Sequence, residues 1–243
     1  MEPLQSRVAF VAYLDILGFT KLVQDQPEVV GDVLEQFTAI SSEQGSEALD
    51  YLLFSDLIIL YTKDDSELSF QEILSKVADL QYKMLERQIP IRGCISHGHI
   101  KLLSGSRGHI IAGSPIIDAY QYEGRQQWVG VMLSPGRLKS YEGFMSWYWT
   151  QFRSPFAGDR KVAAYKSIPL KDSSGTIGAF SGYAVVPNLH NKWGSHDYSM
   201  LLRRIEMSML QAPDVAIQAK YNRTLEFLTG QHKELVMRMA GNG

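Results

Sequence analysis

Three charged residues lie in stretches of the chain that are otherwise apolar or β-prone. Asp15 sits in the run VAYLDILGF, Asp56 separates two short β-prone segments, and Arg92 lies in the middle of a further predicted strand. Carboxylate oxygens are the ligands that Mg²⁺ and Mn²⁺ prefer, and a buried guanidinium group needs a carboxylate or a phosphate beside it. If these three side chains meet, they could bind metal ions and a phosphate group.

Each of the three residues also has a purely structural interpretation. A buried aspartate such as Asp15 often accepts hydrogen bonds from turn amides, Asp56 would be an ordinary hairpin residue, and Arg92 could pair with a structural carboxylate. Three charges on three strands that are expected to be neighbours are harder to explain independently. We therefore favour a shared site.

The elements around these residues predict an α+β fold. Strand-like and helix-like stretches follow the order β-α-β-β-α-β, with a β-α-β continuation. This order is typical of a ferredoxin-like or palm-like core, with helices on one face of a mainly antiparallel sheet. In such a core the first strand lies beside the hairpin, which brings Asp15 and Asp56 to one sheet edge. The expected strands are residues 8–14, 51–54, 57–61, 90–98 and 127–133, and the expected helices are residues 29–40, 69–85 and 114–123.

The turn directly after Asp15 is a candidate phosphate site. Its backbone N–H groups would lie at a helix N-terminus, where phosphate oxygens bind well. The residues of this turn are Ile16, Leu17, Gly18, Phe19 and Thr20.

The chain is expected to form a catalytic core over residues 1–145 and a C-terminal extension over residues 146–243. The extension would pack on the core within one structural domain. Its expected strands lie near residues 162–166 and 183–186, and its expected helices near residues 198–210 and 214–228.

Composition excludes several classes of function. The 243 residues are 45% hydrophobic and 21% charged, with a formal net charge of −2. Without a basic excess we expect no nucleic-acid partner and no direct membrane contact. The single cysteine, Cys94, allows no disulfide framework, and the polar start MEPLQSR has no apolar targeting core, so a cytoplasmic location is expected.

Four stretches, in the same order, resemble the core motifs of the class III nucleotidyl cyclases. They are LDILGFT at 14–20, FSDLI at 54–58, IRGCISHG at 91–98 and GSPIIDAY at 113–120. The match spans roughly residues 8–135. With Ser-Asp in place of Gly-Asp and an Arg-Gly-Cys-Ile-Ser strand, the chain is most similar to the bacterial pyrimidine cyclases of Pycsar antiphage defence.

This resemblance implies a reaction and a site. Asp15 and Asp56 would bind two divalent ions, Mn²⁺ or Mg²⁺, with the Ile16 carbonyl also available, and residues 16–20 would hold the β- and γ-phosphates. Arg92 would counter their charge while the ribose 3′-hydroxyl attacks the α-phosphate and pyrophosphate leaves. The favoured substrate is UTP, which gives cyclic UMP for a separate effector. The family works as head-to-tail homodimers with active sites between the subunits.

The sequence departs from the family pattern at two places. The lysine that reads a purine base is replaced by Leu52, and the neighbouring Tyr51 could stack on a pyrimidine or be an ordinary surface tyrosine. Ile117 and Gln121 stand where the family has its transition-state asparagine and arginine. Asp118, Gln121 or Arg125 could serve instead.

Three alternatives stay open. The substrate could be CTP, since either pyrimidine would fit beside Tyr51. The chain could also be a degenerate cyclase-like module that binds a nucleotide without turnover. The palm of a diguanylate cyclase ranks last, because FSDLI lacks the glycine pair of the GG(D/E)EF hairpin.

Overall fold

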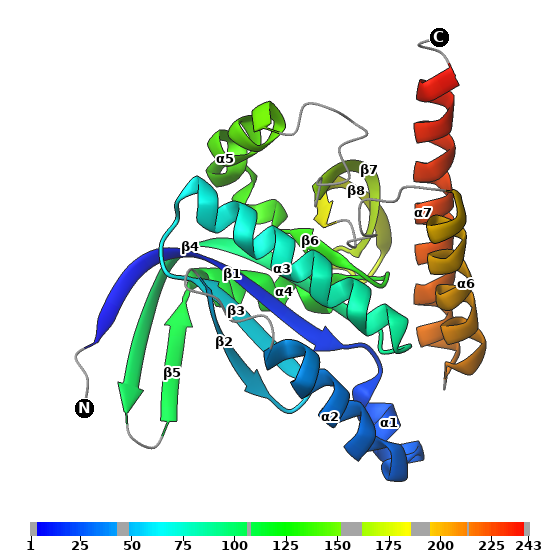
Figure 1. Cartoon of the computed structure of the whole chain (residues 1–243), viewed down its shortest axis with the longest axis horizontal. Helices are drawn as coiled ribbons and strands as arrows, with labels where there is room; N and C mark the ends of the chain where they lie inside the picture. The colour runs from blue at the N-terminus through cyan, green and yellow to red at the C-terminus, as the bar shows by residue number, and fades with distance from the viewer. Residues whose placement is uncertain are drawn as a thin grey trace.

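The computed structural model describes residues 4–42, 49–105, 108–151, 162–185, 195–212 and 214–240, which form one mixed sheet with helices around it (Figure 1). The strands are β1 (Gln5–Ile16), β2 (Leu49–Phe54), β3 (Leu57–Thr62), β4 (Ile91–Gly105), β5 (Gly108–Gly113), β6 (Val131–Leu133), β7 (Val162–Lys171) and β8 (Ile177–Val185). The helices are α1 (Phe19–Asp25), α2 (Pro27–Ser42), α3 (Glu67–Glu86), α4 (Ser114–Arg125), α5 (Leu138–Gln151), α6 (Ser195–Gln211) and α7 (Val215–Ala240), with a 3₁₀ turn at Pro135–Arg137. None of the described helices is long and apolar enough to cross a membrane.

The sheet has β1 between two strands that come later in the chain. Its order is β2-β3-β1-β4-β6-β8-β7, and β5 pairs with β4 outside this path. The strand pairs are antiparallel except β4 with β6, which run parallel. The predicted α+β fold with a mainly antiparallel sheet is confirmed. The late strands form the hairpin β7–β8, which joins the same sheet through β6.

Both faces of β1 are covered, as its nearly unbroken apolar sequence requires. Phe10, Ala12 and Leu14 belong to the main core together with side chains of α2 and α3. Tyr13 faces the other way, into a second cluster that contains Ala119 of α4. The sequence prediction put helices on one face only, whereas α4 packs against the face opposite α3.

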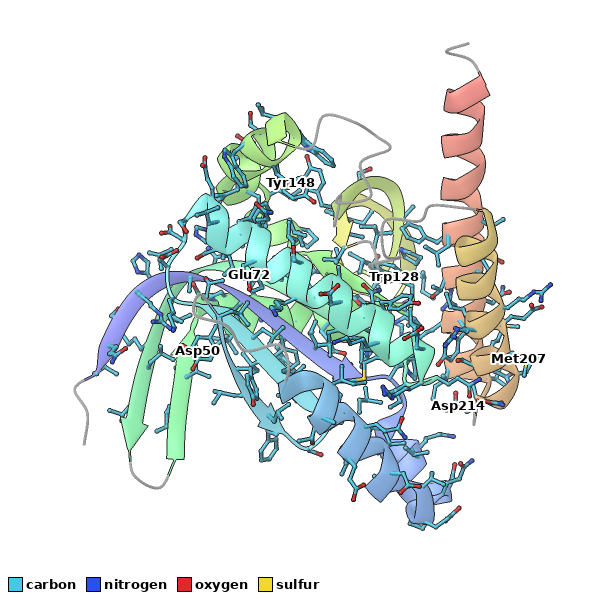
Figure 2. The ribbon with its side chains drawn as sticks, viewed as in Figure 1. Asp50, Glu72, Trp128, Tyr148, Met207 and Asp214 are labelled. Atoms are coloured by element: carbon cyan, nitrogen blue, oxygen red, sulfur yellow. The ribbon has the colours of Figure 1, made fainter. Side chains whose placement is uncertain are left out.

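The C-terminal helices α6 and α7 form a hairpin beside one end of the sheet (Figure 1). Ile217 and Tyr221 of α7 pack with Leu17, which directly follows β1. The ring of Trp128 lies 4.9 Å from that of Phe227, measured between centroids (Figure 2). The extension therefore contacts the core at the turn after Asp15.

Several predicted elements and boundaries differ from the structure. A strand was expected over residues 127–133, but β6 is confined to Val131–Leu133. The short helix α1 precedes α2 and was not predicted as a separate element. Helix α3 begins at Glu67 because the Ser66 hydroxyl accepts a hydrogen bond from the Ser69 amide and caps the helix.

Candidate functional site

Strand register brings the three predicted charged residues together. Asp15 lies opposite Arg92 of β4 on one side of β1 and opposite Leu57 of β3 on the other. Asp56 directly precedes Leu57 in the two-residue turn of the β2–β3 hairpin, and its carbonyl accepts a hydrogen bond from the Ile16 amide at 3.1 Å. The two aspartates therefore lie at adjacent strand ends, with Arg92 beside them.

Arg92 is bound by two carboxylates. Its Nε and Nη2 atoms donate to Oδ1 and Oδ2 of Asp15 at 3.1 and 3.2 Å, and Nη2 lies 2.6 Å from Oε1 of Glu123. The Arg92 and Glu123 side chains are 16% and 5% exposed, so water screens this group weakly. The guanidinium expected to face a phosphate is thus paired within the chain.

Glu123 is a site residue that the sequence prediction missed. It follows Pro115 and Ala119 at four-residue intervals on α4, and all three are buried. Residues spaced in this way share one helix face. The two small apolar residues before Glu123 are therefore a signal that its carboxylate points inward, toward the buried arginine that needed a partner.

Burial is the main influence on the pKa values of Asp56 and Glu123. Burial raises the pKa of Asp56, and the charge of Asp15 raises it further, although Arg92 opposes both. Burial and the Asp15 charge raise the pKa of Glu123 to about 7, against the lowering effect of Arg92. Burial would lower the pKa of Arg92, but the two carboxylates bound to it raise it. A cation placed between Asp15 and Asp56 would relieve the repulsion between these two carboxylates.

The predicted phosphate turn is only partly available. The amide of Ile16 donates to the Asp56 carbonyl, and the amide of Leu17 donates to the Pro90 carbonyl at 2.8 Å. Gly18, with φ at 84°, is the N-cap of α1. The amides at the start of a helix have no intrahelical acceptor, so Gly18, Phe19 and Thr20 are the ones left to bind an anion.

Tyr51 and Leu52 lie on opposite faces of the sheet. Leu52 pairs with Ile59 and shares the Asp15 face, whereas Tyr51 packs against the core cluster that contains α2 and α3. Successive residues of a strand must alternate in this way. Tyr51 therefore lies away from Asp15, contrary to its expected role beside a bound base.

Helix α4 presents an uncharged outer face. Ile117 and Tyr120 are 59% and 58% exposed, and Gln121 is also exposed. Two of the three substitutes considered for the transition-state residues are engaged elsewhere. Asp118 accepts hydrogen bonds from the Ser96 and Ser134 hydroxyls, and Arg125 donates to the Lys171 carbonyl at 2.6 Å. Gln121 is the candidate that faces outward.

Within the described residues, no group of three or more His, Cys, Asp or Glu side chains is arranged to hold a metal. The donors at the sheet edge are the carboxylates of Asp15 and Asp56, with the Ile16 carbonyl next to them. These are hard oxygen ligands, which suit Mg²⁺ or Mn²⁺ if phosphate and water oxygens complete the coordination. The donor set fits such ions.

No family model matches the chain, and no curated protein matches it. Among solved structures it is similar to an adenylate/guanylate cyclase/hydrolase from Silicibacter pomeroyi, with 16% identity and a TM-score of 0.49 over 76% of this chain and 99% of that one. A bacterial light-regulated adenylyl cyclase matches at 14% identity and a TM-score of 0.46, over 86% and 58% of the two chains. A class III adenylyl cyclase-like ATP-binding protein from Pseudomonas aeruginosa matches at 19% identity and a TM-score of 0.43, over 54% and 34%. The chain thus spans 58% of the length of the light-regulated adenylyl cyclase and 34% of the length of the Pseudomonas aeruginosa protein.

Proposed function

We propose that this chain is a nucleotidyl cyclase that converts a pyrimidine nucleoside triphosphate, UTP in first place, to its 3′,5′-cyclic monophosphate and pyrophosphate. The observation that carries the proposal is the register that places Asp15 and Asp56 at adjacent strand ends, with Arg92 beside them. This is the minimum set for holding metal ions and a polyphosphate together.

The carboxylates of Asp15 and Asp56 and the carbonyl of Ile16 would hold two Mn²⁺ or Mg²⁺ ions. Bound there, the ions would offset the triphosphate charge and lower the pKa of the ribose 3′-hydroxyl. Asp15 must exchange Arg92 for a metal ion in this state. Glu123, 2.6 Å from Arg92, keeps the guanidinium partnered during the exchange.

The chain itself positions the reacting groups. The amides of Gly18, Phe19 and Thr20 would bind the β- and γ-phosphates, and Arg92 would reach them once it has left Asp15. The bond from the 3′-oxygen to the α-phosphorus forms, the bond between the α-phosphorus and its bridging oxygen breaks, and pyrophosphate leaves. The proton of the 3′-hydroxyl passes to water.

Preference for a pyrimidine rests on Leu52. This apolar side chain occupies the Asp15 face at the place where a lysine would reach a purine, and Tyr51 is withdrawn from that face.

We further propose a cytoplasmic homodimer with active sites at the interface, which signals through a separate effector in antiphage defence. The exposed Ile117 and Tyr120 on the same face support such an interface.

A second function, nucleotide binding without turnover, is favoured by the outer face of α4. Ile117 carries no hydrogen-bonding group and Gln121 carries no charge, so this helix offers little to stabilise a transition state. Both functions predict nucleotide binding, but only the first predicts a product.

The test incubates the pure protein with each of the four NTPs and Mn²⁺ or Mg²⁺ and identifies products by mass spectrometry. Cyclic UMP is expected, and Asp15→Asn and Asp56→Asn should each lower its formation by about 100-fold or more. Asp32→Asn, at an exposed position of α2, is the matched control and should change nothing. Cyclic CMP would make the chain a cytidylate cyclase, and a purine product would overturn the pyrimidine assignment. Binding without any product would favour the second function.

A further inference from the structure

Helix α7 brings a lysine to the site from the far end of the chain. Ile217 lies against Gly18, since a Cβ added to that glycine would come 2.6 Å from Ile217 Cδ1. One turn further along α7 is Lys220, and one turn beyond it the Thr224 hydroxyl accepts a hydrogen bond from the Val129 amide at 2.8 Å. Residues spaced by three and four share a helix face, so Lys220 is on the face that contacts the core.

This part of α7 is fixed in place. Lys21 of α1 forms an ion pair of 3.2 Å with Asp214, which lies where the α6–α7 hairpin meets the body of the molecule (Figure 2). The other Asp214 oxygen accepts a hydrogen bond from the Ile217 amide at 2.7 Å and caps the helix. The turn of α7 that carries Lys220 therefore lies between two residues, Ile217 and Tyr221, that pack with Leu17.

The charged neighbours of Lys220 are the residues of the site. Its ammonium group interacts electrostatically with Arg92, Asp15, Glu123 and Lys171. None of the ion pairs among the described residues includes Lys220. The lysine is half-buried, near two carboxylates whose closest cation is already Arg92.

Such a position is unfavourable for a lysine in the absence of a ligand. Burial and the positive charge of Arg92 lower the pKa of Lys220 to about 8, although Asp15 and Glu123 act in the opposite direction. Two cations that share a partly dry site repel each other, and a ligand with several negative charges removes that repulsion. Binding sites commonly keep groups that reduce the stability of the empty fold.

We propose that Lys220 is a phosphate-binding residue of this site, which together with Arg92 binds the polyphosphate group of the nucleoside triphosphate. The inference rests on the proposed function for the identity of the ligand. It assigns a ligand contact to the C-terminal extension, which was expected to pack on the core.

The alternative is a structural lysine that neutralises Asp15 and Glu123. The two roles predict opposite effects on the empty protein. If Lys220 is structural, Lys220→Gln removes positive charge that neutralises the two carboxylates, and the midpoint of thermal unfolding falls. If Lys220 binds phosphate, the same change removes an unfavourable charge, and the midpoint stays or rises.

The binding experiment uses the full chain and two probes, 3′-deoxy-UTP, which has no attacking hydroxyl, and inorganic tripolyphosphate. Lys220→Gln should weaken the binding of both by about tenfold or more, measured by calorimetry. Lys220→Arg keeps the charge and should restore most of the affinity. Arg203→Gln, at an exposed position of α6, removes a charge from the same hairpin and should leave both affinities unchanged.

The outcomes separate this inference from the proposed cyclase activity. If the natural chain makes cyclic nucleotide and Lys220→Gln binds both probes normally, the lysine has no phosphate role and the cyclase stands. If Lys220→Gln weakens both probes while no NTP gives a product, the phosphate role stands and the cyclase does not. If the natural chain binds neither probe, the phosphate role is overturned.

Discussion

Arg92 joins two carboxylates from different elements, and each of them depends on it. Asp15 belongs to β1 and Glu123 to α4, while Arg92 belongs to the strand between them in space. Only 16% of the Arg92 side chain is exposed. If the arginine is removed, little water can therefore reach the two carboxylates, and both are left poorly solvated. One residue therefore links the sheet to the helix on its second face.

Arg92→Ala should lower the free energy of unfolding by on the order of 3 kcal/mol, because it leaves two partly buried carboxylates without their main cation. Adding Glu123→Gln should recover part of the loss, since one unpaired charge is then removed. Urea denaturation of the two single variants and the double variant gives the coupling energy. Additive effects would mean that Arg92 and Glu123 act independently, contrary to the 2.6 Å contact.

Lys220 gives a prediction on pH. Its folded-state pKa, about 8, lies below the ordinary value of 10.5, so the unfolded chain binds more protons between these two pH values. The contribution of Lys220 to stability therefore rises as the pH increases from 8 toward 10.5. Below pH 8 both states are protonated and the full unfavourable contribution is present.

Thermal unfolding of the natural chain and of Lys220→Met, measured at pH 7.5 and at pH 10, isolates this effect. The advantage of the variant should be largest at pH 7.5 and shrink at pH 10. Phenols with raised pKa values, such as that of Tyr13, destabilise both proteins alike at high pH and cancel in the comparison. An unchanged difference between the two proteins would contradict the lowered pKa.

At the scale of elements, close approaches of backbone position the site. Gly18 joins β1 to α1 with φ at 84° and lies against α7. Gly93 lets β4 approach β1 next to the pair of Asp15 and Arg92, since a Cβ there would overlap the Tyr13 carbonyl oxygen. A side chain at position 18 would meet the flexible Ile217 side chain, whereas one at position 93 would meet the backbone of β1.

Gly18→Ala should lower the free energy of unfolding by about 1–2 kcal/mol, from left-handed strain and from the contact with Ile217. In an Ile217→Ala background the same change should cost less, because the contact is gone. Gly93→Ala should lower the free energy of unfolding more than Gly18→Ala does and should yield little folded protein. Gly124→Ala, on the open side of α4 where a Cβ meets nothing within 4 Å, is the control and should stabilise by about 0.5 kcal/mol. Circular dichroism during urea titration measures all four.

The sequence predicted the elements whose signals are local. The apolar run of β1, the spacing of the β2–β3 hairpin and the charge of Arg92 within a strand were enough to expect Asp15, Asp56 and Arg92 at one place. Features set by tertiary packing were not predicted. The face of Tyr51 depends on strand register, the position of α4 depends on which side of the sheet has room, and Lys220 reaches the site only because α7 packs on Gly18.

At the scale of the whole molecule, the outer face of α4 is the surface that the proposed dimer would cover. Ile117 and Tyr120 are exposed there, on the same side of the sheet as Asp15. Light scattering coupled to gel filtration should give the mass of a dimer for the natural chain, and Ile117→Glu should shift it to a monomer because a buried charge disrupts an apolar interface.

Leu210→Glu is the matched control for the dimer. Leu210 is 69% exposed on α6, and this change should leave the mass at that of a dimer. A monomeric natural chain, or an unchanged dimer in Ile117→Glu, would remove α4 from the interface.

The central place of β1 also determines when the chain can fold. Asp15 and Arg92 are separated by 77 residues in the sequence, and β1 has no partner strand until β3 and β4 have been made. Contacts of this separation require large loops to close and slow the folding of a domain. On the ribosome, β1 thus emerges before the other strands of the sheet and waits longest with both edges unpaired. A chain cut before the end of β4 keeps that strand without its second neighbour, and aggregation is the expected fate of such a fragment.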